Sequence, residues 1–262
     1  MRGVALAVIL FPLGLPAQLI TRLSAETDAA FEQYVRKIEP KSKIDAAMQA
    51  RLRNGEIIVE GNTPKDGEPV PGGLIHDWEG SIFFPGATLS QTAALLQDFA
   101  RHKQWYPEIV DSKLLSRQGP RVRGSWTLLK KSVLTLVLRA ELDSKYQATS
   151  PKQGTIVSQS GPIVEIADYR TSKQSDFPAG EGHGFLWRFN GYWTLSEADR
   201  GIYAECRIVS LSRDVPGNLG WIVSPFLRSM PRDSLESTLK NTRAALAQGP
   251  TKQVKTDSLR ID

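Results

Sequence analysis

The sequence predicts an α+β fold in which a curved antiparallel sheet closes over a hydrophobic interior against a long C-terminal helix. Strand-forming runs follow one another from residue 109 to residue 212, separated by turn clusters such as Gln118-Gly119-Pro120. The last two runs, 184–197 and 202–212, are rich in aromatic and apolar residues. A breaker at 215–218 then leads into an apolar-faced helix that ends near Ala247. Strands joined by such short turns favour an antiparallel meander.

The composition is that of an ordinary globular protein and excludes several classes of function. The chain has 262 residues, of which 40% are hydrophobic and 23% charged, and its net charge is +5. This length suits one domain with an extension. The basic residues are interspersed with acidic ones and form no block that would follow a phosphate backbone. We therefore expect no nucleic-acid partner, at most transient contact with a membrane surface, and a monomer.

The first 17 residues are typical of an export signal. Arg2 provides a positive start, residues 4–15 are almost wholly apolar, and Ala17 offers a small residue for cleavage. The apolar run is shorter than the ~20 residues that span a membrane. We expect an exported protein, periplasmic or secreted, with the signal cleaved. A retained N-terminal helix or anchor is the alternative.

Residues 18–73 predict a helical extension followed by a linker. Phe31, Tyr34, Val35 and Ile38 share one face of a helix in the segment 25–52, which Pro40 interrupts. A short strand is expected at 55–60, and the Pro- and Gly-rich stretch 61–73 predicts a linker or long loop. The apolar stripe of the helix needs a partner, and we expect it to cover the outer face of the strand at 133–143.

Residues 74–248 predict the main domain, followed by a disordered tail at 249–262. A strand at 74–84 precedes a helix at 89–99 and a short helix or turn that runs through Trp105 to Pro107. The remaining expected strands are Ile109–Arg117, Arg121–Lys130, Val133–Gln147, Thr155–Arg170, Gly184–Glu197 and Ile202–Ser212. A longer loop is expected at 171–182, before the fifth of these strands.

This order of elements resembles the START-like or SRPBCC superfamily, which includes lipid-transfer domains and polyketide cyclases. The resemblance covers residues 74–247 and rests on Trp193-Thr-Leu195 before a turn, on Gly201-Ile-Tyr-Ala204 after it, and on the breaker before the last helix. Within the group, the chain is most similar to exported bacterial members with a comparable extension. The resemblance implies a helix-grip fold: a curved seven-stranded antiparallel sheet wrapped around the C-terminal helix, with a cavity between them.

The face of each strand can be assigned from its alternation, because alternate side chains share a face. We assign Phe185, Trp187, Phe189, Trp193 and Leu195 to the concave side, together with Ile202, Ala204, Cys206 and Ile208. Arg188, Asn190 and Tyr192 fall on the opposite face, as do Tyr203, Glu205 and Arg207.

The C-terminal helix is expected to divide at Pro231, since proline cannot donate a backbone hydrogen bond. Its first part could then act as a gate, and Trp105 and Tyr106 would lie near the opposite rim. The expected ligand-binding residues are Trp105, Tyr106, Trp126, Leu136, Phe185, Trp187, Phe189, Trp193, Cys206, Trp221, Phe226 and Met230. For each of them the alternative is plain core packing.

No catalytic group, metal site or cofactor motif is evident. Cys206 is the sole cysteine and is expected to be a buried, inert thiol. The three histidines, His76, His102 and His183, lie far apart without ligand spacing, and His183 is expected in a loop. The charged strand residues Arg139, Glu141, Arg188, Glu205 and Arg207 are expected on the outer face of the sheet.

The sequence therefore predicts non-catalytic binding of a hydrophobic small molecule or lipid. Two alternatives stay open. A cyclase or dehydratase on the same fold would have convergent polar groups in the interior. A structural or interaction protein would have a filled core.

Overall fold

The structure is a computed structural model that describes residues 20–64, 67–131, 135–214 and 217–248, with side chains described outside 217–229. The predicted export signal and tail lie outside these residues and stay predictions.

The helices are α1 (Ala25–Val35), α2 (Ala46–Arg53), α3 (Leu89–Leu96), α4 (His102–Trp105) and α5 (Gly217–Ala247). The strands are β1 (Thr21–Arg22), β2 (Ile58–Gly61), β3 (Glu68–Val70), β4 (Gly73–Pro85), β5 (Ile109–Gln118), β6 (Arg121–Lys131), β7 (Thr135–Ser150), β8 (Gln153–Ser160), β9 (Val164–Ala167), β10 (Ser175–Asp176), β11 (Glu181–Gly182), β12 (Arg188–Ala198) and β13 (Gly201–Arg213).

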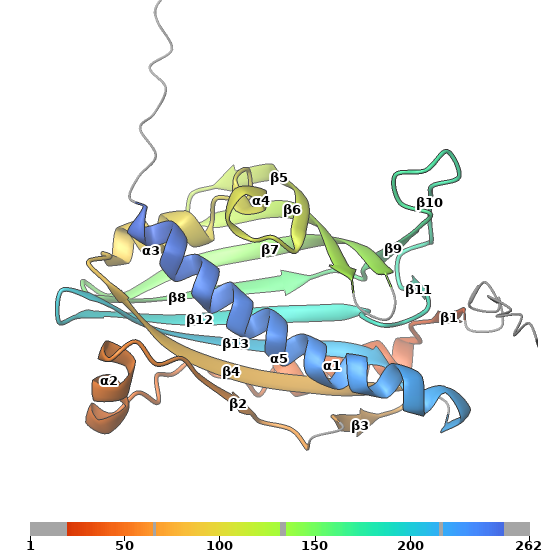
Figure 1. The fold of residues 1–262 in the computed structure, drawn as a ribbon, viewed down its shortest axis with the longest axis horizontal. Coiled ribbons are helices and arrows are strands. Elements are labelled where there is room, and N and C mark those ends of the chain that lie inside the picture. The colour runs from red at the N-terminus through yellow and green to blue at the C-terminus, as the bar shows by residue number, and fades with distance from the viewer. Residues whose placement is uncertain (1–19, 65–66, 132–134, 215–216, 249–262) are drawn as a thin grey trace, which may run out of the picture.

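Seven long strands form an antiparallel sheet in the order β5-β6-β7-β8-β12-β13-β4. Helix α5 crosses one face of this sheet, and α1 lies on the other side (Figure 1). The predicted helix-grip fold is therefore confirmed. Four short strands add to the expected seven, since β2 and β3 pair with β4, β9 pairs with β7, and β10 pairs with β9.

Two of the expected strands differ from the structure. The strand predicted over 155–170 breaks into β8 and β9, because Pro162 between them has no N–H to donate to the ladder. The strand predicted from Gly184 begins only at Arg188. Gly184 has a φ of 70°, which an extended strand does not accommodate.

Helix α5 is continuous across both of its prolines, so the predicted division at Pro231 is wrong. Its fully buried Leu235 and Leu239 pack against β4. A Cβ atom built on Gly80 of β4 would lie only 2.6 Å from Leu239 Cδ1. The missing side chain of Gly80 therefore lets the helix approach the sheet closely at this point.

The N-terminal extension is packed against the convex side of the sheet. Phe31 and Val35 of α1 are buried against Ile75, Tyr192, Val209 and Leu211 of β4, β12 and β13. The prediction that this helix covers the middle strand, now seen as β7, is wrong. Helix α1 covers β4, β12 and β13 in the other half of the sheet.

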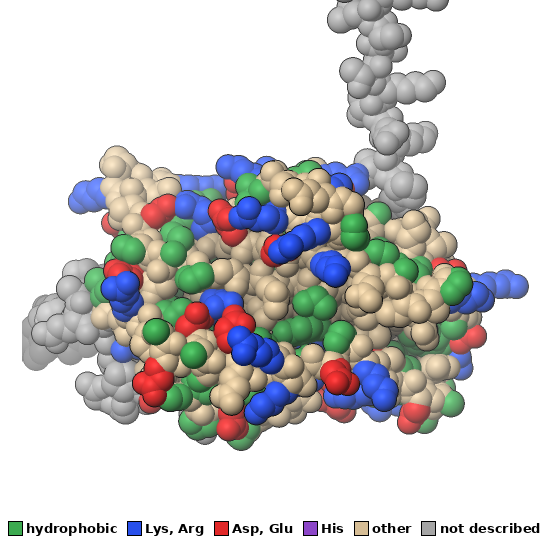
Figure 2. Space-filling view, turned by 180° about the vertical axis from the view of Figure 1, so that it is seen from behind, with side chains coloured by type: hydrophobic (Ala, Val, Ile, Leu, Met, Phe, Trp, Pro, Cys, Tyr) green, Lys and Arg blue, Asp and Glu red, His purple; other side chains and the backbone are tan. Residues whose placement is uncertain are grey.

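Arg188 anchors α1 to β12. This guanidinium is 8% exposed, lies over the Phe31 ring, pairs with Asp28, and donates to Glu32 Oε1 at 2.6 Å and to the Ser160 carbonyl at 2.9 Å. A buried arginine is tolerated when its donors are satisfied in this way. The rest of this side carries interspersed acidic and basic side chains (Figure 2).

The stretch predicted as a linker contributes β3 to the sheet, and β2 lies beside β4 as expected from the strand predicted at 55–60. Leu52 of α2 is buried with Ile58, Phe83 and Tyr203. The extension and the main domain thus share one sheet and its packing.

We predict that Phe31→Ala lowers the free energy of unfolding by about 3–5 kcal/mol, because a fully buried aromatic ring is lost from the contact between α1 and the sheet. Urea denaturation measures this change. The control is Gln33→Ala on the exposed face of the same helix. Equal stability of the two variants would show that α1 is not an integral part of the fold.

Candidate ligand-binding site

A cavity of about 190 Å³ lies between α5 and the concave face of the sheet. Its floor is formed by β6, β7, β8, β12 and β13. Its roof is the second half of α5, and one end is closed by α3, α4 and the segment leading into β5. Beside it, α3, α5 and the sheet bury a continuous apolar cluster that includes Phe84, Leu96, Leu195 and Ile202.

The sheet side of the cavity is aromatic and aliphatic. Trp126 of β6 stacks on Phe189 of β12 with ring centroids 6.0 Å apart, and on Phe99 at 5.5 Å. Leu136, Leu138, Trp193 and other inward-facing side chains extend this surface. Alternation along each strand brings these residues to one face. Such a wall binds apolar groups by removing their surface from water.

His102 fixes the orientation of Trp126. The Trp126 Nε1–H donates to His102 Nδ1 at 2.9 Å, so the ring proton of His102 sits on Nε2 and is donated to the Leu95 carbonyl at 3.2 Å. The imidazole is therefore neutral, with both nitrogens engaged. Burial lowers the pKa of His102 to about 4.

Tyr106 joins the closed end of the cavity to the roof. The Thr242 hydroxyl donates to the Thr238 carbonyl at 2.8 Å, so the Tyr106 hydroxyl donates to Thr242 Oγ1 at 3.0 Å. Burial raises the pKa of Tyr106, which stays protonated. This bond holds α4 against α5 within the wall.

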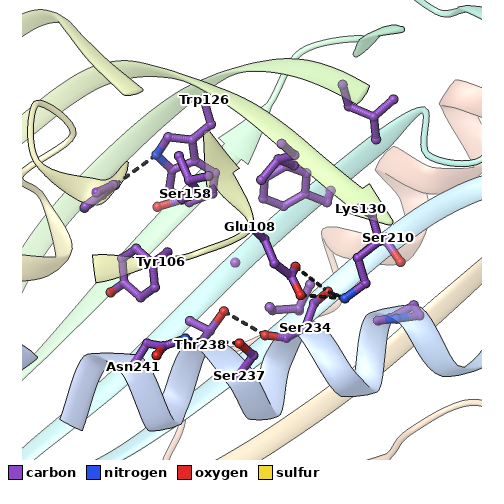
Figure 3. A pocket seen from close by; sticks show the side chains of 18 of the residues that line it. Tyr106, Glu108, Trp126, Lys130, Ser158, Ser210, Ser234, Ser237, Thr238 and Asn241 are labelled. Carbon is purple, nitrogen blue, oxygen red and sulfur yellow. Dashed lines mark hydrogen bonds and ion pairs between the residues drawn. The ribbon is translucent and has the colours of Figure 1, made fainter. Parts of the chain in front are cut away.

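The roof is polar, in contrast to the floor. Ser234, Ser237, Thr238 and Asn241 of α5 all line the cavity (Figure 3). Their spacing of i, i+3, i+4 and i+7 places them on one face of the helix. We call these four residues the polar stripe. The sequence analysis predicted the apolar face of this helix and missed the polar stripe, although the same periodicity places its four residues on one face.

A charged bridge lies at the margin of the cavity. Lys130 Nζ is 2.5 Å from Glu108 Oε1 and 3.2 Å from Ser234 Oγ, and the Ser234 hydroxyl donates to Glu108 Oε2 at 2.9 Å (Figure 3). The Glu108 and Lys130 side chains are 32% and 24% exposed. The bridge therefore connects the β5–β6 side of the mouth to α5, with its two charges compensating each other.

The structure brings together most of the predicted ligand-binding residues. Those that line the cavity are Tyr106, Trp126, Leu136, Phe189, Trp193, Cys206 and Met230. The side chains of Trp221 and Phe226 lie outside the described residues.

Three predicted residues lie elsewhere. Trp187 is buried in the cluster under α1, because it precedes β12 and does not follow the alternation of that strand. Phe185 stacks on His183 with ring centroids 5.7 Å apart, in an apolar cluster next to the cavity. Trp105 packs beside the core with the Arg101 guanidinium over its ring.

The charged strand residues lie on the outer face, as predicted. Arg139 pairs with Asp176, Glu141 with Arg123, and Arg207 with Asp77. Glu205 accepts a hydrogen bond from the Lys43 backbone at 2.8 Å, and burial raises its pKa. None of these four residues lines the cavity.

The polar groups of the cavity suit orientation of a ligand better than proton transfer. His102 has both ring nitrogens occupied, and Glu108 is held by Lys130 and Ser234. Burial raises the pKa of the Cys206 thiol, which disfavours the reactive thiolate. His183 lies between β11 and β12, where it pairs with Glu165. Within the described residues, no three His, Cys, Asp or Glu side chains gather as a metal site, and no helix is long and apolar enough to cross a membrane.

The fold is similar to that of START lipid-transfer structures. A STAR-related lipid transfer protein fragment from Xanthomonas axonopodis is 17% identical, with 70% of this chain and 97% of that chain covered and a TM-score of 0.47. Human STARD10 is 10% identical, with 82% and 85% covered and a TM-score of 0.48.

An aromatase/cyclase has a similar fold as well. The Zhui aromatase/cyclase from Streptomyces sp. R1128 is 10% identical, with 66% of this chain and 94% of that chain covered and a TM-score of 0.42. No protein-family model matches the sequence, and no curated protein does. The predicted resemblance to the START-like or SRPBCC group is confirmed as a resemblance of fold alone.

We predict that the stability of the protein falls as the pH is lowered from about 6.5 to about 4. The unfolded chain takes up a proton on His102 in this range, whereas the folded protein keeps this ring neutral. The depressed pKa accounts for a loss of roughly 3 kcal/mol in the free energy of unfolding, and this contribution is fully present above pH 6.5. Urea denaturation across this range should show a shallower pH dependence for His102→Gln. If the free energy of unfolding depended on pH identically in the wild type and in His102→Gln, the neutral, buried imidazole would be contradicted.

Proposed function

We propose that this protein binds a hydrophobic small molecule or a single-chain lipid, without catalysis, in the cavity between α5 and the sheet. The observation that carries the proposal is the cavity itself. It has an aromatic floor, a polar roof and an opening marked by the partly exposed Glu108 and Lys130. Ligand sites in proteins commonly combine an apolar lining with a few placed polar groups.

The size of the cavity limits the ligand. An apolar cavity of about 150 Å³ in another protein holds benzene. At about 190 Å³, this one holds a compact ring or the inner part of one chain. Two acyl chains together exceed that space. We therefore favour a small ring compound or a single-chain amphiphile, with the affinity supplied mainly by burial of apolar surface.

The other two functions considered from the sequence are less well supported. A structural protein with a filled core would not contain a cavity lined by side chains from six strands. A cyclase or dehydratase would need a group free to move a proton, whereas His102 and Glu108 both have their polar atoms engaged. Export and a role in transport stay proposals that accompany the binding function.

Gly191 offers a direct test of the site. It lines the cavity on β12, and a Cβ atom built there meets nothing within 4 Å. We predict that Gly191→Leu places an isobutyl group in the cavity, which lowers the amount of co-purified hydrophobic ligand at least tenfold while the protein stays folded. Native mass spectrometry followed by organic extraction measures the bound ligand.

The control is Gly161→Leu, because a Cβ atom at Gly161 also meets nothing within 4 Å and that residue does not line the cavity. This variant should keep the ligand. Equal amounts of bound ligand in Gly191→Leu and Gly161→Leu would contradict binding in the cavity. A ligand that is recovered chemically altered after incubation would favour the enzyme instead.

A further inference from the structure

We propose that the ligand is a neutral amphiphile whose hydroxyl or carbonyl group binds Ser237 and Asn241, and that the site discriminates against carboxylates and ammonium groups. This inference rests on the proposed binding function. It adds the chemical class of the ligand and its orientation, with the polar end at α5 and the apolar part on the sheet.

The polar stripe leaves part of its hydrogen-bonding capacity open. Thr238 donates to the Ser234 carbonyl, and the Ser234 hydroxyl is used by Glu108. The Asn241 side-chain amide donates to Ser237 Oγ at 3.1 Å. Within the described part of the chain, the Ser237 hydroxyl proton and Asn241 Oδ1 have no protein partner. Ser237 and Asn241 both line the cavity, about one turn of helix apart, so the pair has one donor and one acceptor left for a ligand (Figure 3).

These two groups match a neutral polar group. A hydroxyl can accept from Ser237 and donate to Asn241 at the same time, and a carbonyl can accept from Ser237. Neither residue carries a charge that would compensate an ion. An ion placed against them would lose its hydration without gaining a counter-charge, which is costly.

Both charges near the polar stripe are already compensated. Glu108 and Lys130 are 2.5 Å apart, and Ser234 contacts both of them. A carboxylate at Lys130 would compete with Glu108, whereas an ammonium group at Glu108 would compete with Lys130. In either case a charge that is already compensated gains little from the ligand.

The opposite wall is mainly apolar, although Ser158 and Ser210 add hydroxyl groups to it. Trp126, Phe189, Leu136 and Leu138 face the stripe from the sheet. The Trp126 ring N–H is already donated to His102. The apolar part of the ligand would therefore lie on the sheet while its polar end stays at the helix.

A panel of ligands with one chain length tests the inference. We would measure the affinity of the delipidated full-length protein for decanol, decyl methyl ether, decanoate and decylammonium at neutral pH, by the change in tryptophan fluorescence. Trp126 and Trp193 line the cavity and report on its occupancy. Decanol should bind at least tenfold more tightly than either ion. The ether, which accepts but cannot donate, should be intermediate.

Variants identify the residues that bind the polar end of the ligand. Ser237→Ala combined with Asn241→Leu should weaken decanol binding about five- to tenfold and change the affinity for the ether by a smaller factor, because decanol loses two hydrogen bonds. Ser237→Ala alone, which removes a single oxygen, should give a smaller loss of affinity for decanol. This single variant provides the test if the double variant does not fold. Lys240→Ala, on the exposed side of the same helix, is the control and should bind like the wild type.

The possible outcomes separate the two proposals. If none of the four ligands bound, the proposed function itself would be contradicted. If decanoate or decylammonium bound as tightly as decanol, or if the Ser237 and Asn241 variants bound decanol like the wild type, only the inference about the polar end would be overturned.

Discussion

Leu235 and Leu239 of α5 pack against β4 where Gly80 has no side chain, and the rest of the interior depends on this contact. A Cβ atom at Gly80 would lie 2.6 Å from Leu239, so the helix can reach the sheet here only because the residue is glycine. With its apolar face used on β4, α5 presents the polar stripe to the other half of the sheet. The space between that stripe and strands β6, β7, β8, β12 and β13 is the cavity.

The two walls of this space have different physical roles. The floor removes apolar surface from water, which supplies affinity with little directional preference. The roof and the Glu108–Lys130 bridge supply direction, because hydrogen-bonding groups there favour one orientation and one charge state of a ligand. The bonds from Trp126 to His102 and from Tyr106 to Thr242 hold the wall rigid, so little order has to be gained when a ligand binds.

The sequence predicted the fold well wherever local rules operate. Turn clusters located the long strands, and alternation assigned Ile202, Ala204 and Cys206 to the concave core. The prediction from sequence failed where the structure interrupts a local pattern. Pro162 breaks a strand, and Trp187 precedes the strand whose alternation was applied to it. The polar stripe was missed because serine, threonine and asparagine on a helix are ordinarily read as a solvated face. The lining of the cavity shows that this face points inward.

The most direct measurement of the central claim uses Cys206, which is the sole cysteine and lines the cavity. Burial disfavours the Cys206 thiolate, so methyl methanethiosulfonate modifies this thiol slowly, and the rate followed at alkaline pH reports access to the cavity floor. Saturating decanol should slow this measurable reaction at least tenfold while circular dichroism shows an unchanged fold. A measurable rate that is equal with and without bound decanol would contradict a ligand site between α5 and the sheet.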